Sequence, residues 1–156
     1  MEITRTRCLV LACGNTLRGD DGVGPWLAVW AEERFKAEPR VRVISRQQWT
    51  PELAEEIPGS DGVLFIDCSI DSAPGAVSMR FVEPAADATI ITAHRLGAPE
   101  LLALTRELYE AAPCTALLLT VGAASIDLRE DLSAAVRAAL PEARDLIEKA
   151  VLQMLA

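Results

Sequence analysis

The sequence predicts an α/β fold, a three-layer sandwich in which a five-stranded, mostly parallel twisted sheet with one antiparallel strand has helices on both faces. Apolar runs alternate with helical patterns from end to end. The first run, RCLVLAC, is continuously apolar, which is typical of a strand covered on both faces. A length of 156 residues with 51% hydrophobic residues suits one buried core, so we expect a single domain over residues 1–156.

The first half of the chain predicts three strands separated by helices. The first strand covers residues 7–13, and Val23, Trp26, Leu27 and Trp30 then recur at helical spacing, which predicts that both tryptophans pack on the sheet. Two further strands are expected at residues 41–45 and 62–66, and Asp67 at the end of the latter. Between them, the sequence TPE at 50–52 indicates a helix with a hydroxyl cap and a proline in its first turn.

The second half predicts two strands and three helices. The fourth strand, residues 76–83, follows the third too closely for a parallel crossover, so we expect it to be antiparallel to the third. A helix from Pro99 carries Leu101, Leu104 and Leu108 on one face, and the fifth strand covers residues 115–121. We expect a short helix after Ser133 and a longer one from Pro141, with the apolar positions Ala143, Leu146, Ala150 and Met154.

Charge and composition exclude several classes of protein. The 23 acidic and 15 basic residues give a net charge of −8, which disfavours nucleic acid or an anionic membrane as a partner. The single histidine, His94, excludes three-histidine zinc sites and HExxH metalloproteases. Four cysteines in apolar segments and no signal sequence favour buried thiols in the cytoplasm.

Candidate site residues gather at the carboxyl ends of the predicted strands, where open α/β sheets bind ligands. They are Asp20 or Asp21, Asp67 and His94, an oxygen and nitrogen donor set suited to a borderline divalent metal. Alternative roles are a helix cap for either member of the Asp20–Asp21 pair, a turn cap for Asp67 and a backbone hydrogen bond for His94.

Other chemistries fit the sequence less well. The loop CGNTLRGDDGVG lacks the GxGxxG dinucleotide pattern, and its adjacent carboxylates would repel a pyrophosphate. The spacing of an EF-hand and the GxSxG elbow are also absent. Cys68 next to Asp67 is a candidate nucleophile, although a small buried residue is the better interpretation.

The motif GNTLRGDDGVG at 14–24, the apolar strand that ends in Asp67, and His94 before LGAPELLAL resemble those of the nickel-iron hydrogenase maturation endopeptidases. The segments QQWTPELAEEI and VGAASIDLREDLSAAVRAALPEA are also similar, so the resemblance covers almost the whole chain. Two positions depart from the family pattern. Asp21 stands where glutamate is frequent, and Ala12 where glycine is common.

The resemblance implies an aspartyl-type endopeptidase that removes the C-terminal extension of a hydrogenase large-subunit precursor after nickel insertion. It implies that Asp21, Asp67 and His94 bind the nickel and that Asp21 and Asp67 also act in catalysis. The nickel would arrive with the precursor, with no permanently bound cofactor, and we expect a monomer. A non-hydrolytic nickel-binding accessory protein or chaperone is the alternative, and Trp49 belongs either to the docking surface or to the core.

Overall fold

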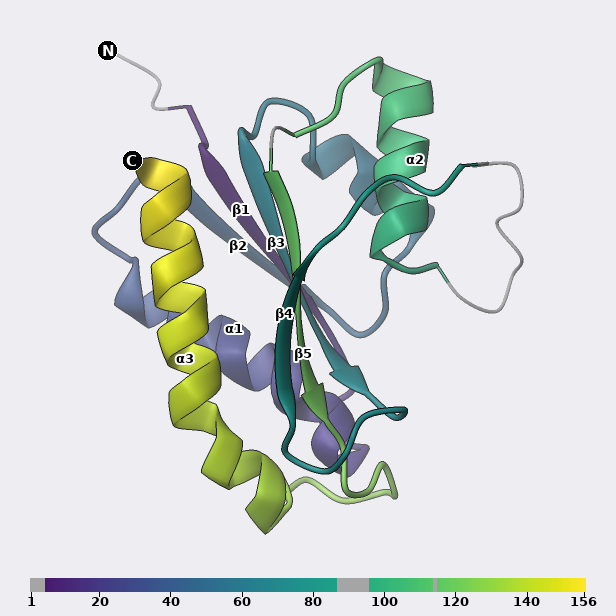
Figure 1. Ribbon diagram of the computed structural model, residues 1–156, viewed down its shortest axis with the longest axis vertical. Helices are drawn as coiled ribbons and strands as arrows, with labels where there is room; N and C mark the ends of the chain where they lie inside the picture. Colours follow the sequence, from purple (N-terminus) through teal and green to yellow (C-terminus); the bar gives the residue numbers. More distant parts are fainter. Residues whose placement is uncertain (1–4, 87–95, 114) are drawn as a thin grey trace.

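Five strands form one sheet in the order β2-β1-β3-β5-β4 in the computed structural model, which describes residues 5–86, 96–113 and 115–156 (Figure 1). The elements are β1 (Cys8–Cys13), η1 (Gly19–Gly22), α1 (Val23–Arg34), β2 (Val41–Arg46), η2 (Pro51–Glu56), β3 (Gly62–Ser69), β4 (Val77–Phe81), α2 (Ala98–Tyr109), β5 (Thr115–Gly122) and α3 (Ala134–Leu155), where η denotes a 3-10 helix. Strands β2, β1, β3 and β5 are parallel, and β4 pairs antiparallel with β5. The predicted α/β class and the single antiparallel strand are therefore confirmed.

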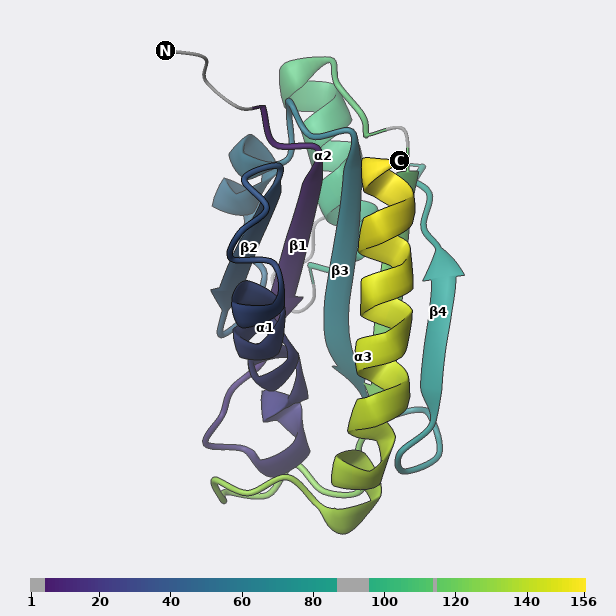
Figure 2. The same ribbon diagram turned by 90° about the vertical axis from the view of Figure 1, so that its left-hand side faces the viewer.

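Helices cover both faces of the sheet. Helices α1 and α3 pack on one face, and α2 and η2 pack on the other, as Figures 1 and 2 show from two sides. Side chains alternate along β3, so Leu64 and Ile66 contact the first layer while Val63 and Phe65 contact the second. The central strands are continuously apolar because both of their faces are buried.

The fourth strand has the predicted direction but a neighbour that the sequence did not indicate. Strand β4 pairs with β5, at the edge of the sheet, with Val77 opposite Val121 and Phe81 opposite Leu117. Because β3 and β5 are parallel, β4 still runs antiparallel to β3. The short connection from β3 therefore passes over the end of β5.

Helix α1 differs from the prediction in the face that it buries. Trp26 is 51% exposed and Trp30 only partly buried, whereas Val23, Leu27, Ala28 and Ala31 are buried. The small alanine side chains allow the helix to approach the sheet closely, and the contact stripe is centred on Leu27 and Ala28. The expectation that both tryptophans belong to the core was wrong for Trp26.

Helices α3 and α2 also differ from the sequence prediction. Residues 134–155 form one continuous helix with Pro141 inside it, and the Ser133 hydroxyl caps its start by accepting the Val136 N–H at 3.2 Å. Buried residues on both sides of Pro141 hold the helix on the sheet, although proline leaves one carbonyl without its helical bond. In α2, Leu108 is 60% exposed, and Leu102 and Thr105 are buried together with Leu101.

The segment after β2 covers the core on the α2 side. It forms the 3-10 helix η2, in which the Leu53 N–H bonds the Thr50 carbonyl at 3.1 Å and the Thr50 hydroxyl makes no cap. Trp49 is only 8% exposed, and its ring packs edge-on against Phe65 at a centroid distance of 5.3 Å. Trp49 is thus a core residue, and its alternative role on a docking surface is wrong.

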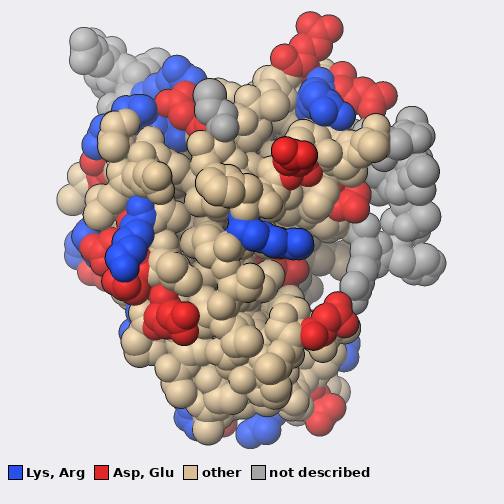
Figure 3. All heavy atoms as spheres, viewed as in Figure 1, with Lys and Arg blue, Asp and Glu red and all other residues tan. Residues whose placement is uncertain are grey.

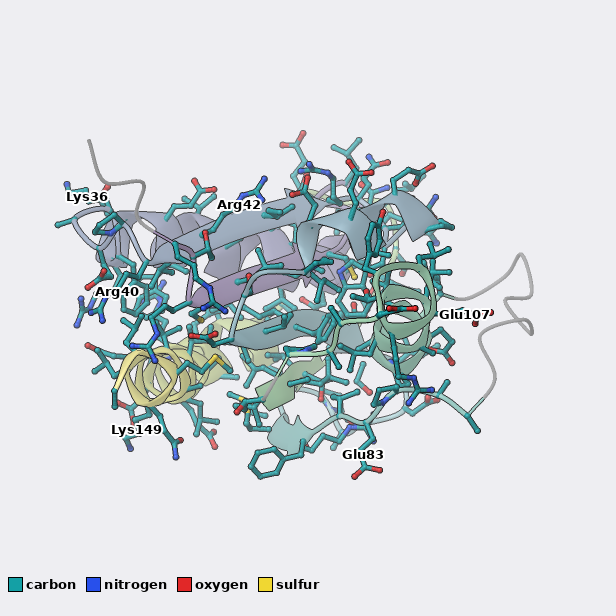
Figure 4. All side chains as sticks on the ribbon, turned by 90° about the horizontal axis from the view of Figure 1, so that it is seen from above. Lys36, Arg40, Arg42, Glu83, Glu107 and Lys149 are labelled. Atoms are coloured by element: carbon teal, nitrogen blue, oxygen red, sulfur yellow. The ribbon has the colours of Figure 1, made fainter. Side chains whose placement is uncertain are left out.

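Most charged side chains lie on the outside of the fold, and Asp20 is a buried exception. On the face drawn in Figure 3, basic and acidic residues are interspersed. The charged residues labelled in Figure 4 lie around the periphery of the sheet and helices: Lys36, Arg40, Arg42, Glu83, Glu107 and Lys149. None of the helices in the described part of the chain combines the length and apolar character needed to cross a bilayer.

Candidate functional site

The carboxyl ends of the parallel strands bring two of the predicted site residues together. Asp67 lies on β3, and Asp21 lies on η1, between β1 and α1. Both carboxylates act on the same two thiols, because each raises the pKa of Cys13 and of Cys68. The carboxylates of Asp21 and Asp67 therefore both lie near these two cysteines.

Asp67 is inside β3 and not at its end, because the strand continues to Ser69. Pairing with β1 ends at Ile66, which lies opposite Ala12, whereas pairing with β5 continues and places Asp67 opposite Thr120. Burial also decreases from Asp67 onward. The side chain thus follows the last fully covered residue of the strand, and its Oδ1 accepts the Cys68 N–H at 2.7 Å.

Cys13 is a neighbour of Asp67 that the sequence did not suggest. Cys13 packs with Phe65 on the α2 face, and alternation along β3 places Asp67 on that same face. The Cys13 thiol donates a hydrogen bond to the Asp67 carboxylate. The parallel register after Ala12 and Ile66 was the missing signal, since register cannot be read from strand composition alone.

Asp21 is held by the loop that precedes it. Its Oδ2 accepts the Asn15 N–H at 2.8 Å, and the Asn15 Oδ1 in turn accepts the Leu17 N–H at 2.9 Å. The Asp21 carbonyl lies directly against Gly14, whose φ of +151° is a conformation that favours glycine. The loop sequence therefore fixes both the backbone and the carboxylate of Asp21.

Asp20 has a different role from its neighbour. Its side chain is buried and accepts backbone N–H groups from Ala124, Ser125 and Ser133. Burial alone would raise the pKa of Asp20, but these hydrogen bonds outweigh burial and lower it. Of the two candidates in the sequence, Asp20 is engaged with backbone N–H groups after β5, whereas Asp21 raises the pKa of both Cys13 and Cys68.

The cysteines at the site are protonated thiols. Burial is the largest cause that raises the pKa of Cys68, to about 12, and the carboxylates of Asp21, Asp67 and Asp20 add to the effect. Burial, Asp67 and Asp21 also raise the pKa of Cys13. A nucleophilic cysteine needs a lowered pKa, so this environment disfavours Cys68 as a nucleophile. Cys8, Cys13 and Cys68 are free, and Cys68 is only partly buried.

The predicted third ligand, His94, lies outside the described residues. Within the described residues, no three His, Cys, Asp or Glu side chains have a geometry that could hold a metal ion. Asp21 and Asp67 supply two oxygen donors, which is an incomplete ligand set for a protein-bound metal. The donor set therefore fits a metal only with further ligands.

Gly14 and Gly24 in the first loop allow close contacts between backbone segments of this chain. A side chain at Gly14 would meet the Asp21 carbonyl, and one at Gly24 would meet the Cys13 carbonyl. Close approach of the chain's own backbone therefore accounts for glycine at both positions. A groove of about 480 Å³ between β4, β5 and α3 contains none of the predicted site residues.

Comparison with solved structures finds the same fold in hydrogenase maturation peptidases. The NiFe hydrogenase maturation protease HybD of Thermococcus kodakarensis is 28% identical, with a TM-score of 0.65 and coverage of 92% of this chain and 98% of that one. The hydrogenase 2 maturation peptidase of a Thaumarchaeota archaeon is 26% identical, with a TM-score of 0.68 and coverage of 94% and 98%.

The hydrogenase maturating endopeptidase HybD of E. coli shares the fold with a TM-score of 0.75. It is 22% identical, and the match covers 95% of this chain and 93% of that one. No protein-family model matches the sequence, and no curated protein matches it. The likeness therefore comes from structure over nearly the full length of both chains.

Proposed function

Because the chain belongs to the family of hydrogenase maturation endopeptidases, we propose that it removes the C-terminal extension of a nickel-iron hydrogenase large-subunit precursor after nickel insertion. The observation that carries this proposal is the convergence of Asp21 and Asp67 on one site. These carboxylates come from different segments, and they meet where open α/β sheets bind their ligands.

The nickel is part of the substrate in this proposal. Asp21 and Asp67 would contribute oxygen ligands and His94 a nitrogen ligand, while the precursor supplies the remaining ones. An incomplete ligand set on the enzyme suits this division, since a metal already held by the precursor needs only a few further contacts. Recognition of the nickel would locate the scissile peptide bond.

The carboxylates also suit the hydrolytic step. A water molecule attacks the scissile carbonyl carbon, its proton passes to Asp21 or Asp67, and the C–N bond breaks as the leaving amine takes up a proton. A metal near the scissile bond polarises a carbonyl and acidifies water. The Asp67 carboxylate is held for this work by the Cys68 N–H and the Cys13 thiol.

The test is cleavage of purified precursor, followed by intact mass. Wild-type protein should shorten nickel-loaded precursor at its C-terminus and leave nickel-free precursor unchanged. Binding of loaded precursor without any change in mass would contradict the protease and support the accessory protein or chaperone. Cleavage of both forms at equal rates would contradict nickel recognition.

Single substitutions test the site residues. Asp21→Asn and Asp67→Asn should each lower the cleavage rate by about 100-fold or more, the scale expected when a general base is lost. His94→Ala should also lower the rate, because it removes the nitrogen ligand that would recognise the nickel. Asp71→Asn is the matched control, because Asp71 is an exposed carboxylate in the loop just after β3. Full cleavage by all three site variants would refute the assignment.

The remaining proposals concern the cellular location, the oligomeric state and the partners of the protein. Free thiols at Cys8, Cys13 and Cys68 fit the reducing cytoplasm, where we place the protein. We also propose that it acts as a monomer that binds the large precursor transiently, with neither nucleic acid nor membrane as a partner. Sedimentation with and without loaded precursor tests this, and a stable dimer in the absence of precursor would contradict it.

A further inference from the structure

We propose that Asp20 is a positioning residue of this peptidase: its buried carboxylate fastens the segment 123–133 to the loop that carries Asp21, and so holds Asp21 in place for cleavage. This inference rests on the proposed function. It assigns this role to Asp20 in place of capping of the adjacent helix α1, which has no side-chain cap. It also makes the connection between β5 and α3 a structural part of the site.

The carboxylate of Asp20 is fully engaged with the opposite segment. It is 1% exposed, and its Oδ2 accepts the N–H groups of Ala124 at 2.8 Å and Ser125 at 3.2 Å. Its Oδ1 accepts the N–H of Ser133 at 2.7 Å. One side chain thus binds both ends of the segment 123–133, from the end of β5 to the start of α3.

Backbone hydrogen bonds also join the loop before Asp21 to the segment 123–133. The Asp20 N–H bonds the Ser125 carbonyl at 3.0 Å, and the Gly19 N–H bonds the Arg129 carbonyl at 2.8 Å. The Arg129 N–H in turn bonds the Leu17 carbonyl at 3.0 Å. The two segments therefore form a short ladder, and the Asp20 carboxylate supplies its buried end.

Asp21 depends on this contact because its own bonds stay within its loop. Its carboxylate is held by Asn15, and its N–H bonds the Arg18 carbonyl at 3.2 Å. The start of the loop is anchored where the Gly14 N–H bonds the Arg46 carbonyl at 3.0 Å. Asp20 anchors the other end, so release of Asp20 frees the loop beside the site.

Asp20→Asn is the first test, since asparagine has the same shape but presents an NH₂ group to backbone donors. Amide hydrogen exchange of the protein alone should accelerate at Ala124, Ser125 and Ser133. At a temperature where the variant is folded, kcat on nickel-loaded precursor should fall about 10- to 100-fold, because a misplaced catalytic group costs rate steeply. Unchanged exchange at these three groups would overturn the proposal.

Ile147→Ala is the control for general loss of stability. Ile147 is fully buried on α3, so its truncation lowers stability within the core itself. Compared at equal distance below their melting temperatures, Ile147→Ala should keep its kcat while Asp20→Asn loses it. Equal kcat values for the two variants would mean that Asp20 contributes only to stability.

A second pair of variants isolates a single bond and serves if Asp20→Asn does not fold. Ser133 has a φ of −65°, which proline adopts, so Ser133→Pro removes the N–H that Asp20 accepts. Ser133→Ala keeps that N–H while losing the same hydroxyl cap. Ser133→Pro should have the lower kcat, and equal values would contradict positioning by Asp20.

Wild-type protein separates the two proposals. If it fails to cleave loaded precursor, the proposed function fails, and the role of Asp20 in cleavage fails with it. Hydrogen exchange of the protein alone still reports whether the Asp20 carboxylate holds the N–H groups of Ala124, Ser125 and Ser133. If wild type cleaves and Asp20→Asn cleaves equally well, only the inference about Asp20 is refuted.

Discussion

The thiol of Cys13 donates a hydrogen bond to the carboxylate of Asp67 across the neighbouring strands β1 and β3. The bond is made by the protonated thiol, so it raises the pKa of Cys13 together with burial, which is the larger cause. A residue with an apolar role in the core thereby also holds a polar group of the site. Cysteine suits both roles because it is small, apolar and a weak donor.

The raised pKa of Cys68 predicts that this thiol is alkylated slowly in the folded protein. With a pKa of about 12, Cys68 has a thiolate fraction of about 10⁻⁴ at pH 8, whereas a free cysteine is roughly a quarter ionised. Iodoacetamide should therefore label Cys68 at least about 100-fold faster in urea than in buffer, as measured by peptide mass spectrometry. Rapid labelling of Cys68 in the native protein would contradict the raised pKa.

Gly14 predicts a large loss of stability on substitution. A Cβ there would collide with the Asp21 carbonyl, and φ is +151°. Gly14→Ala should lower the free energy of unfolding by about 2–4 kcal/mol in urea denaturation. Gly59 is the matched control, since its φ of +92° is also positive but no atom lies within 4 Å of its Cβ position. Gly59→Ala should cost about 1 kcal/mol. Equal losses would show that conformation outweighs the collision.

The sequence predicted the sheet better than the helix surfaces. Strands β1 and β3 are buried on both faces, so their unbroken apolar runs were strong signals. Which face of a helix is buried depends on the elements that pack against it. Trp26 and Leu108 follow the apolar helical pattern but are exposed. Pro141 predicts a helix boundary because proline has a low helix propensity, but packing of buried residues on both sides of it outweighs that cost.

The site was predictable only where its residues follow strands. Asp67 and the loop with Asp21 could be placed at the carboxyl edge of the sheet from the order of elements alone. The choice between Asp20 and Asp21 could not be made, because it depends on N–H groups of Ala124 and Ser133, more than 100 residues away. His94 stays a prediction, since it lies outside the described residues.

The environment of Trp49 predicts that the substitution Trp49→Phe has a small effect on stability. In the described part of the chain its Nε1 has no hydrogen-bond partner, while the ring packs on Phe65 in the core. Trp49→Phe should cost less than about 2 kcal/mol in urea denaturation, because it loses volume but relieves a buried unpaired donor. Trp49→Ala should cost about 3–5 kcal/mol. A loss for phenylalanine as large as that for alanine would indicate that the indole N–H is bonded.

Asp20 predicts a specific dependence of stability on pH. Its folded-state pKa is lowered by backbone hydrogen bonds, which outweigh the opposing effect of burial. The resulting stabilisation is fully present above the unfolded-state pKa, about 3.9, and is lost as the pH falls through the lower folded-state value. Asp20→Asn lacks this titration, so the gap in unfolding free energy between wild type and variant should be constant near pH 6–7 and narrow below about pH 4. Urea denaturation at pH 6 and pH 3 measures both gaps, and a gap of equal size at the two pH values would mean that the hydrogen bonds do not favour the ionised carboxylate.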